Sequence, residues 1–251
     1  MKRIWLTGAS SGIGAAMADI LLSQGHFLAV SARNVQALEK LHREYPQQVL
    51  LLPGDLTDPR EVRAMGERIE HVWGHLDQAI LNAGTCEYLD VSAFEANMVE
   101  RVMRANVFSA AYCVEAALPL LRKAGSAANP ARIINIGSVA GHWPYPGGHV
   151  YGATKAFVEQ FGYNLRCDLL GTGVRVTDIA PGMAETEFTL VRTKGDQDAS
   201  DRLYRGTTPL TAEDIAEQIF YVATLPDHIN INRLEIMPSR QAWSPFAVDR
   251  D

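Results

Sequence analysis

Short apolar runs alternate with longer amphipathic stretches along the chain. The apolar runs, rich in valine, isoleucine and leucine, predict strands at 3–6, 27–31, 49–52, 78–81, 132–136, 174–179 and 234–236. Helical periodicity predicts helices at about 12–24, 35–45, 59–72, 93–123, 151–170 and 212–225, with 93–123 expected to be broken into two. Nearly continuous apolar strands, each followed by a helix, are typical of a parallel sheet covered on both faces. We therefore expect one α/β domain over residues 1–251, with about seven parallel strands and helices on both faces of the sheet.

Two helix starts carry capping signals. Asp58 precedes Pro59 and Glu61, and Thr211 precedes two acidic residues, which favours helices that begin at 59 and 212. The segment 182–210 has no strand pattern and is long for a loop, so we expect a substrate loop or lid there. The tail 238–251 contains aromatic residues, which predicts that it packs on the body of the protein or on another subunit.

Composition restricts the class of protein. Apolar residues make up 47% and charged residues 21% of the 251 residues, and the net charge is −6, which argues against a nucleic-acid binder. The start of the chain leaves no room for the apolar core of a signal peptide, and no window predicts a membrane span, so we expect a cytoplasmic protein. Cys86, Cys113 and Cys167 are expected to be free thiols. His142 and His149 have no third ligand at suitable spacing, so no metal site is expected.

A glycine-rich turn lies between the first strand and the first helix. Glycines at this position permit a tight turn and let backbone N–H groups approach a pyrophosphate at the helix N-terminus. This placement predicts a Rossmann-type, doubly wound sheet that binds a dinucleotide. The residues expected to hold the dinucleotide here are Gly8, Ser10, Ser11, Gly12, Ile13 and Gly14.

The end of the second strand indicates which dinucleotide binds. An NAD site generally has a carboxylate there, whereas this chain has Ala32, Arg33 and Asn34. A guanidinium can bind the 2′-phosphate of NADP, so NADP is the predicted cofactor, although a solvated surface arginine is the alternative. Further cofactor contacts are predicted at Asp55, Leu56, Asn82, Ala83 and Gly84, with a turn or cap role equally open for Asp55.

Tyr151 and Lys155 provide the candidate proton chemistry. They are four residues apart at the start of a predicted helix and therefore share one face. An ammonium close to a phenol lowers the pKa of the phenol, as proton transfer to a carbonyl oxygen near neutral pH requires. Ser138 follows the fifth strand, at the edge where such sheets bind ligands. Asn106 lies in the preceding helical region and is a candidate for holding a water or the lysine in place. An ordinary polar helix residue is the alternative for Asn106. After the sixth strand, the expected nicotinamide contacts are Pro181, Gly182, Met183 and Thr186.

The motifs TGASSGIG, NAG, YGATK and PGMAET, with Asn106 and Ser138, together resemble the short-chain dehydrogenase/reductase family. The resemblance implies that Ser138 polarises the substrate oxygen and that Tyr151 exchanges the proton. It also implies that Lys155 binds the nicotinamide ribose and tunes Tyr151, that Asn106 supports a water relay, and that the protein is a homotetramer.

From residue 132 onward the segments GHWPYPGGHVYGATKAF, VRTKGD and LPDHININRLEIMP resemble the NADP-dependent 3-hydroxy acid dehydrogenase branch of that family. Before residue 125 the likeness is to the wider family only. The branch implies substrates such as L-allo-threonine, L-serine or 3-hydroxypropionate, and semialdehydes in the reverse reaction.

A small acid needs a cation for its charged group. Arg192, inside the expected lid, is our candidate, with Lys194 second, and a solvated loop arginine is the alternative. Tyr145 and Trp143 are candidates for shaping the substrate pocket, and loop packing explains them equally well. Two other enzymatic functions stay open: reduction of neutral ketones, or of another anionic aldehyde such as a sulfonated one. A non-enzymatic NADP-sensing module is the remaining alternative.

Overall fold

Parallel strands form one sheet through the middle of the molecule. The computed structural model describes residues 1–87, 90–193, 195–244 and 247–251, without the side chains of residues 191 and 192. Within these residues the sheet has seven strands in the order β3-β2-β1-β4-β5-β6-β7, and each neighbouring pair is parallel. The strands are β1 (Arg3–Thr7), β2 (Phe27–Ala32), β3 (Val49–Pro53), β4 (Gln78–Leu81), β5 (Ala131–Ile136), β6 (Val174–Pro181) and β7 (Arg233–Ile236). The predicted Rossmann-type sheet is confirmed.

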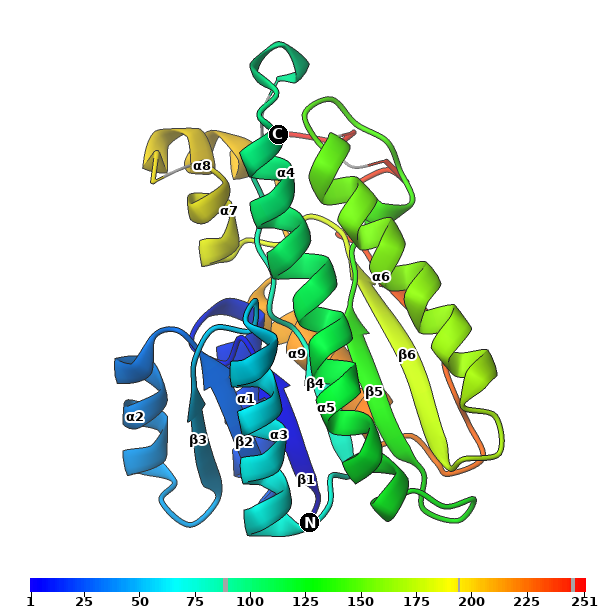
Figure 1. Ribbon diagram of the computed structural model, residues 1–251. Coiled ribbons are helices and arrows are strands. Elements are labelled where there is room, and N and C mark those ends of the chain that lie inside the picture. Colours follow the sequence, from blue (N-terminus) through cyan, green and yellow to red (C-terminus); the bar gives the residue numbers. More distant parts are fainter. Residues whose placement is uncertain (88–89, 194, 245–246) are drawn as a thin grey trace.

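Helices cover both faces of the sheet. In Figure 1, α3, α5 and α6 lie in front of the sheet, and α1 and α9 lie behind it. The α-helices are α1 (Gly12–Ser23), α2 (Val35–Glu44), α3 (Pro59–Trp73), α4 (Ala96–Met103), α5 (Ser109–Ala124), α6 (His149–Asp168), α7 (Glu187–Arg192), α8 (Gln197–Tyr204) and α9 (Ala212–Ala223). Short helical turns occur at η1 (Val91–Ala93), η2 (Arg104–Phe108) and η3 (Val139–Gly141).

The strands are apolar on both faces because each face has its own core. Along β1, Ile4 and Leu6 join the cluster formed with α1, α2 and α9, while Trp5 points to the cluster formed with α3, α5 and α6. Successive strand side chains alternate between faces, so a strand between two helical layers needs apolar residues at most positions on both faces. This requirement explains why the strand pattern was clear in the sequence.

Both predicted capping signals form. The Asp58 side chain accepts a hydrogen bond from the backbone N–H of Arg60, and α3 begins at Pro59. Thr211 and Asp214 form a reciprocal capping box at the start of α9. Side-chain acceptors satisfy backbone N–H groups that a helix start leaves unpaired, and these contacts set where both helices begin.

The predicted helix 93–123 is divided by a wide turn. α4 continues through η2, which is a π-helical turn, directly into α5, and the three form one rod in Figure 1. Asn106 lies in this turn. A π turn adds one residue to a turn without ending the helix. The apolar positions therefore shift around the helix axis at this point, and the sequence shows no helix end.

Segment 182–210 contains two short helices, α7 and α8, which the sequence analysis missed. They lie above the carboxyl ends of the strands in Figure 1. The two ends of the segment pair: Ala184 and Leu210 form a parallel bridge, and Leu210 donates its N–H to the Met183 carbonyl. The Tyr204 hydroxyl donates to the Ala184 carbonyl at 2.7 Å. The segment is therefore a closed loop held at its base.

The tail packs on the body, as expected. Arg250 donates to the backbone carbonyls of Leu203 and Arg205 at the end of α8. Gln241 is buried and accepts a hydrogen bond from the Met183 N–H. In the described part of the chain, helices with the length and apolarity to cross a membrane are absent.

Candidate active site

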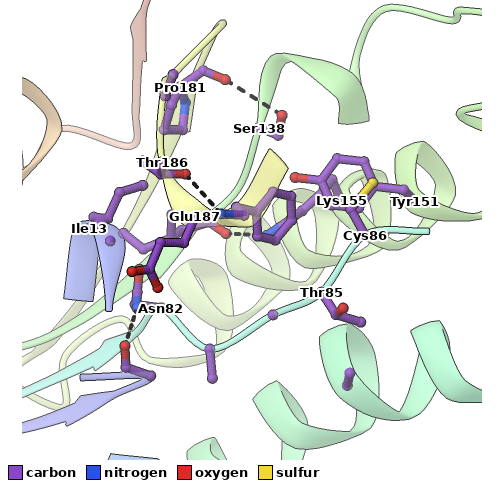
Figure 2. Close-up of a pocket in the computed structure, with 18 of the residues that line it drawn as sticks. Ile13, Asn82, Thr85, Cys86, Ser138, Tyr151, Lys155, Pro181, Thr186 and Glu187 are labelled. Atoms are coloured by element: carbon purple, nitrogen blue, oxygen red, sulfur yellow. Dashed lines mark hydrogen bonds between the residues drawn. The ribbon is translucent and has the colours of Figure 1, made fainter. Parts of the chain in front are cut away.

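A cavity of about 700 Å³ opens at the carboxyl edge of the sheet, beneath α7 and α8. Figure 2 shows side chains from several elements converging on it. Most of the predicted site residues line the cavity: Gly8, Ser10, Ser11, Gly12, Ile13, Arg33, Asp55, Leu56, Asn82, Ala83, Gly84, Ser138, Tyr145, Tyr151, Lys155, Pro181, Gly182, Met183 and Thr186. Predicted cofactor residues and predicted catalytic residues thus share one cavity.

The glycine-rich turn is tied to the end of β4. Gly8 has a φ of +68°, which favours glycine. The side-chain amide of Asn82 donates to the carbonyls of Thr7 and Gly8, and the Thr7 hydroxyl accepts from the Asn82 and Ala83 N–H groups. A methyl group on Gly14 would lie 2.0 Å from the Gly8 carbonyl oxygen. Gly14 therefore does not line the cavity but allows the turn to close against the helix.

Arg33 lies at the far end of the cavity from Tyr151. Its side chain is exposed and makes no ion pair with the residues that the structure describes. Asp55 lines the same end, and its carboxylate accepts from the Thr57 N–H at 2.9 Å, which is the turn role left open above. Asn34, predicted to contact the cofactor, is outside the cavity lining. Its side chain caps α2 by accepting from the Ala37 N–H.

Lys155 is 7% exposed, and its ammonium donates to the Ile136 carbonyl at 2.7 Å. Burial lowers the pKa of Lys155 to about 8, because the charged form loses hydration, while the electrostatic influence of Asp178 and Cys86 opposes the shift. Lys155 is therefore charged at neutral pH and close to its titration range.

Tyr151 lies next to Lys155, as their spacing predicted. The Lys155 nitrogen is 5.7 Å from the centroid of the Tyr151 ring, and Figure 2 shows both residues together with Cys86. The ring of Phe188 in α7 lies beside the tyrosine ring, with 5.8 Å between ring centroids. The Tyr151 ring therefore has neighbours from its own helix and from the segment above the cavity.

Ser138 follows β5 and lines the same cavity as Tyr151. Its hydroxyl accepts from the Ala140 N–H at 3.1 Å and makes a long contact of 3.5 Å to the Pro181 carbonyl (Figure 2). The backbone hydrogen bond orients the hydroxyl oxygen and leaves its proton able to turn toward a ligand.

Asn106 is buried in η2 and does not line the cavity. Its side chain accepts from the Thr85 N–H at 2.7 Å and donates to the Thr85 carbonyl and the Thr154 hydroxyl. A methyl group on Gly84 would lie 3.2 Å from the Asn106 oxygen and 3.8 Å from the Lys155 nitrogen. Asn106 thus joins the strand-end loop to α6 beside Lys155.

The residues after β6 form part of the cavity wall, between the glycine-rich turn and the catalytic candidates. Gly182 donates its N–H to the Ile236 carbonyl, and the Met183 N–H donates to the Gln241 side chain at 2.8 Å. A methyl group on Gly12 would lie 3.6 Å from the Cβ of Thr186. Thr186 therefore stands across the narrow gap from the glycine-rich turn.

The predicted substrate residues are only partly described. Tyr145 lines the cavity, and the Trp143 ring packs edge-on against Trp243 of the tail. The backbone of Arg192 ends α7, but its side chain and the whole of Lys194 lie outside the described residues. Their role as anchors stays a prediction.

Several lining residues were missed by the sequence analysis. Arg101 makes a two-point contact with Glu87, and Arg104 pairs with Glu100 one helical turn earlier. Gln241 comes from the tail. The only signal in the sequence was the polar face of the 93–123 helix, which is equally typical of a solvated surface.

The comparisons with known proteins agree with this arrangement. A family model described as short chain dehydrogenase matches residues 2–197. The chain belongs to the short-chain dehydrogenase/reductase family and is an oxidoreductase, as the motifs predicted.

Three relatives illustrate its position in the family. Sulfoacetaldehyde reductase 2 of Chromohalobacter salexigens is 50% identical over 99% of this chain and 98% of its own length. The NADP-dependent 3-hydroxy acid dehydrogenase of Salmonella typhi is 41% identical over 98% of this chain and 99% of its own length. A solved structure, the closed form of serine dehydrogenase complexed with NADP+, has a TM-score of 0.91 and 37% identity and covers 99% of this chain and 100% of its own. Likeness to these narrower groups thus extends over both halves of the chain, including the part before residue 125.

The glycine contacts predict unequal effects of two substitutions. Gly14→Ala brings a methyl group against the Gly8 carbonyl, and overpacking of this kind costs about 1–3 kcal/mol. Gly12→Ala is the matched control: its φ of +51° costs about 1–2 kcal/mol, and its methyl group meets Thr186 at an ordinary distance. We expect Gly14→Ala to lower the Tm more than Gly12→Ala in thermal unfolding followed by circular dichroism. An equal or reversed order contradicts the close approach at Gly14.

Proposed function

We propose that this protein is an NADPH-dependent reductase of a small anionic aldehyde, with sulfoacetaldehyde as the first candidate substrate. The observation that carries the proposal is the single cavity that joins the glycine-rich turn to Ser138, Tyr151 and Lys155. The 50% full-length identity to a sulfoacetaldehyde reductase supports the choice of substrate.

The described residues fit NADP. The turn around Gly8 and Gly14 has no space for side chains, so a pyrophosphate can approach its backbone N–H groups. Arg33 is exposed at the cavity end where the ribose phosphate would lie, and no carboxylate follows β2 to bind a ribose hydroxyl. Thr186 lies across from Gly12, and we assign it the carboxamide of nicotinamide. When bound, NADPH supplies the hydride that reduces the carbonyl carbon.

The residues of the chain provide orientation and the proton. The Ser138 hydroxyl donates a hydrogen bond to the carbonyl oxygen and fixes its direction. Tyr151 gives its phenolic proton to the same oxygen as the alcohol forms, and the Lys155 ammonium stabilises the phenolate that remains. Asn106 holds the loop and helix on which this geometry depends, through Thr85 and Thr154. In the oxidative direction, Tyr151 accepts the proton.

The charged group of the substrate needs a cation near the carbonyl end of the cavity. Arg101 and Arg104 line the cavity but are paired with Glu87 and Glu100. Segment 182–210 covers this end and carries Arg192 at the end of α7. We therefore assign the anchor to Arg192.

Oxidation of a small 3-hydroxy acid is the second candidate function. It is supported by 41% identity to an NADP-dependent 3-hydroxy acid dehydrogenase and by likeness to a serine dehydrogenase structure. Both candidates use the same residues, because each is a hydride transfer at a carbon close to an acidic group.

Assembly and location form part of the same proposal. We infer a homotetramer in the cytoplasm. Exposed aromatic rings support an assembly: Phe108 stacks on Tyr112, and Phe157 stacks on Phe161, with Phe108 40% and Phe157 43% exposed.

A substrate screen tests the proposed function directly. Purified protein is mixed with NADPH and sulfoacetaldehyde, small 3-oxo acids or neutral ketones, and oxidation of NADPH is followed by its absorbance. We expect the highest kcat/KM for sulfoacetaldehyde and much lower rates with NADH, because Arg33 has no partner on NADH. Faster reduction of neutral ketones than of every anionic aldehyde would refute an anionic substrate.

Tyr151→Phe separates an enzyme from an NADP-sensing module. The substitution removes the proton donor and keeps the ring between its neighbours, so we expect turnover to fall by about 10²–10⁴-fold. NADPH binding, measured by the fluorescence of the bound cofactor, should be nearly unchanged. Full activity of Tyr151→Phe would remove the phenol from the mechanism.

Arg192→Met tests the anchor. Losing a hydrogen-bonded charge pair costs about 1.5–3 kcal/mol, so we expect KM for an anionic aldehyde to rise about tenfold or more. KM for small neutral carbonyls should barely change. Lys194→Met tests the second candidate, a cation of the same segment two residues away, and a larger rise in KM in this variant would move the anchor to Lys194. Equal losses on charged and neutral substrates would exclude Arg192 as the anchor.

A further inference from the structure

Asp178 of β6 is a buried carboxylate without a hydrogen-bond donor. Its side chain is 2% exposed, and neither carboxylate oxygen has a hydrogen-bond partner in the described structure. Burying a carboxylate in this way is costly, so a residue of this kind calls for an explanation. The mechanism above does not use it.

Strand register sets the position of Asp178, and neighbouring glycines leave space for its side chain. Asp178 pairs with Asn135 across β5 and β6, and both side chains lie between the sheet and α6. A methyl group on Gly137 would lie 2.6 Å from one Asp178 oxygen, and a methyl group on Gly162 would lie 3.0 Å from the Asn135 amide. The carboxylate therefore occupies a space that these glycines leave open.

Charged groups from two elements surround this space. Glu159 and Tyr163 of α6 face it, with the Tyr163 hydroxyl donating to Glu159 at 2.9 Å. Arg233 of β7 contacts Glu159 at 3.4 Å and Glu235 at 2.6 Å. The carboxylates of Glu159 and Glu235 thus both have Arg233 as a partner, and Asp178 is the carboxylate of this cluster that lacks a direct one.

Lys155 lies at the other end of the cluster. Its ammonium is bound to the Ile136 carbonyl, one residue before the glycine against which the Asp178 carboxylate packs. The groups that face Lys155 are Asp178 from β6, the Cys86 thiol from the loop after β4, and the Tyr151 ring on its own helix. At neutral pH, Asp178 is therefore the carboxylate that balances the buried ammonium.

We propose that Asp178 is a positioning residue whose buried negative charge keeps the Lys155 ammonium protonated while Tyr151 transfers its proton. This inference rests on the proposed function, because it concerns the same proton donor. Asp178 acts through Lys155 and touches neither substrate nor cofactor.

The titration ranges of the two groups support this coupling. Burial and the nearby Glu159 raise the pKa of Asp178 to about 7, against the attraction of Lys155 and Arg233. Burial lowers the pKa of Lys155 to about 8, against the attraction of Asp178. Between these values both groups are charged, and their opposite charges attract each other. Below the lower value Asp178 is neutral, and Lys155 is protonated without its help.

The experiment compares the pH profile of kcat/KM for aldehyde reduction in the wild type and in Asp178→Asn. Without the negative charge, the pKa of Lys155 falls further, so the alkaline loss of activity should begin about one pH unit lower. Near pH 6, about one unit below the Asp178 titration, the two profiles should converge, because Asp178 is then neutral in both. If Asp178→Asn is insoluble, Asp178→Ala replaces it in the same experiment, because it removes the same charge with a smaller side chain.

Glu159→Gln is the matched control. It removes another carboxylate of the cluster, and the attraction that opposes the lowered pKa of Lys155 comes from Asp178 and Cys86. We expect its alkaline limb to stay in place. An alkaline limb that does not move in Asp178→Asn, or a loss equal at every pH, overturns the inference. A wild type that reduces no aldehyde with NADPH would instead overturn the proposed function.

Discussion

The reversal of strand order beside β1 is the constraint on which the site depends. The chain builds β1, β2 and β3 outward in one direction, and then returns to place β4 against the other side of β1. The loops after β1 and β4 therefore diverge to opposite faces, and a crevice opens between them at the carboxyl edge. Thr7 and Asn82 bridge the base of this crevice through their hydrogen bonds. The cavity above it follows from topology before any catalytic side chain is considered.

Buried charge gives this crevice its chemistry. Lys155 is charged at neutral pH although it is nearly inaccessible, because the Ile136 carbonyl and the nearby Asp178 carboxylate compensate for part of its lost hydration. A charge held in a low-dielectric setting acts more strongly on its neighbours than the same charge in water. The same burial makes Lys155 sensitive to distant charges such as Asp178, which a solvated lysine would not feel. The burial of Lys155 thus explains both its effect on neighbouring groups and its sensitivity to the charge of Asp178.

The sequence was most informative where one physical requirement dominates. Strands buried on both faces must be apolar at most positions, so the predicted strands differ from the observed ones by at most a few residues. Tyr151, Ser138 and the glycine-rich turn were found because each lies directly at the end of a strand or the start of a helix, where topology sets position. The helix caps at Asp58 and Thr211 were local signals and formed as expected.

The rest depends on contacts between distant residues. Helices α7 and α8 are too short for periodicity to reveal, and Asn34 carries a side chain suited both to a ribose and to a helix cap. In the sequence, Arg101 is typical of a solvated helix surface, and only the structure shows its ion pair with Glu87. Asp178 is one of three polar residues in β6, with Arg175 and Thr177, and its lack of a hydrogen-bond partner becomes visible only when the helix above it is in place.

The pairing of Ala184 with Leu210 has a consequence for how this protein can diversify. Both ends of the segment that covers the cavity leave the body at the same point, so everything between them is an insert whose two chain ends meet. Changes in its length or composition need not be transmitted to the sheet, whose core is complete without it. A change in this cover can therefore alter which molecules enter the cavity, while the residues at the carboxyl edge of the sheet beneath it stay in place.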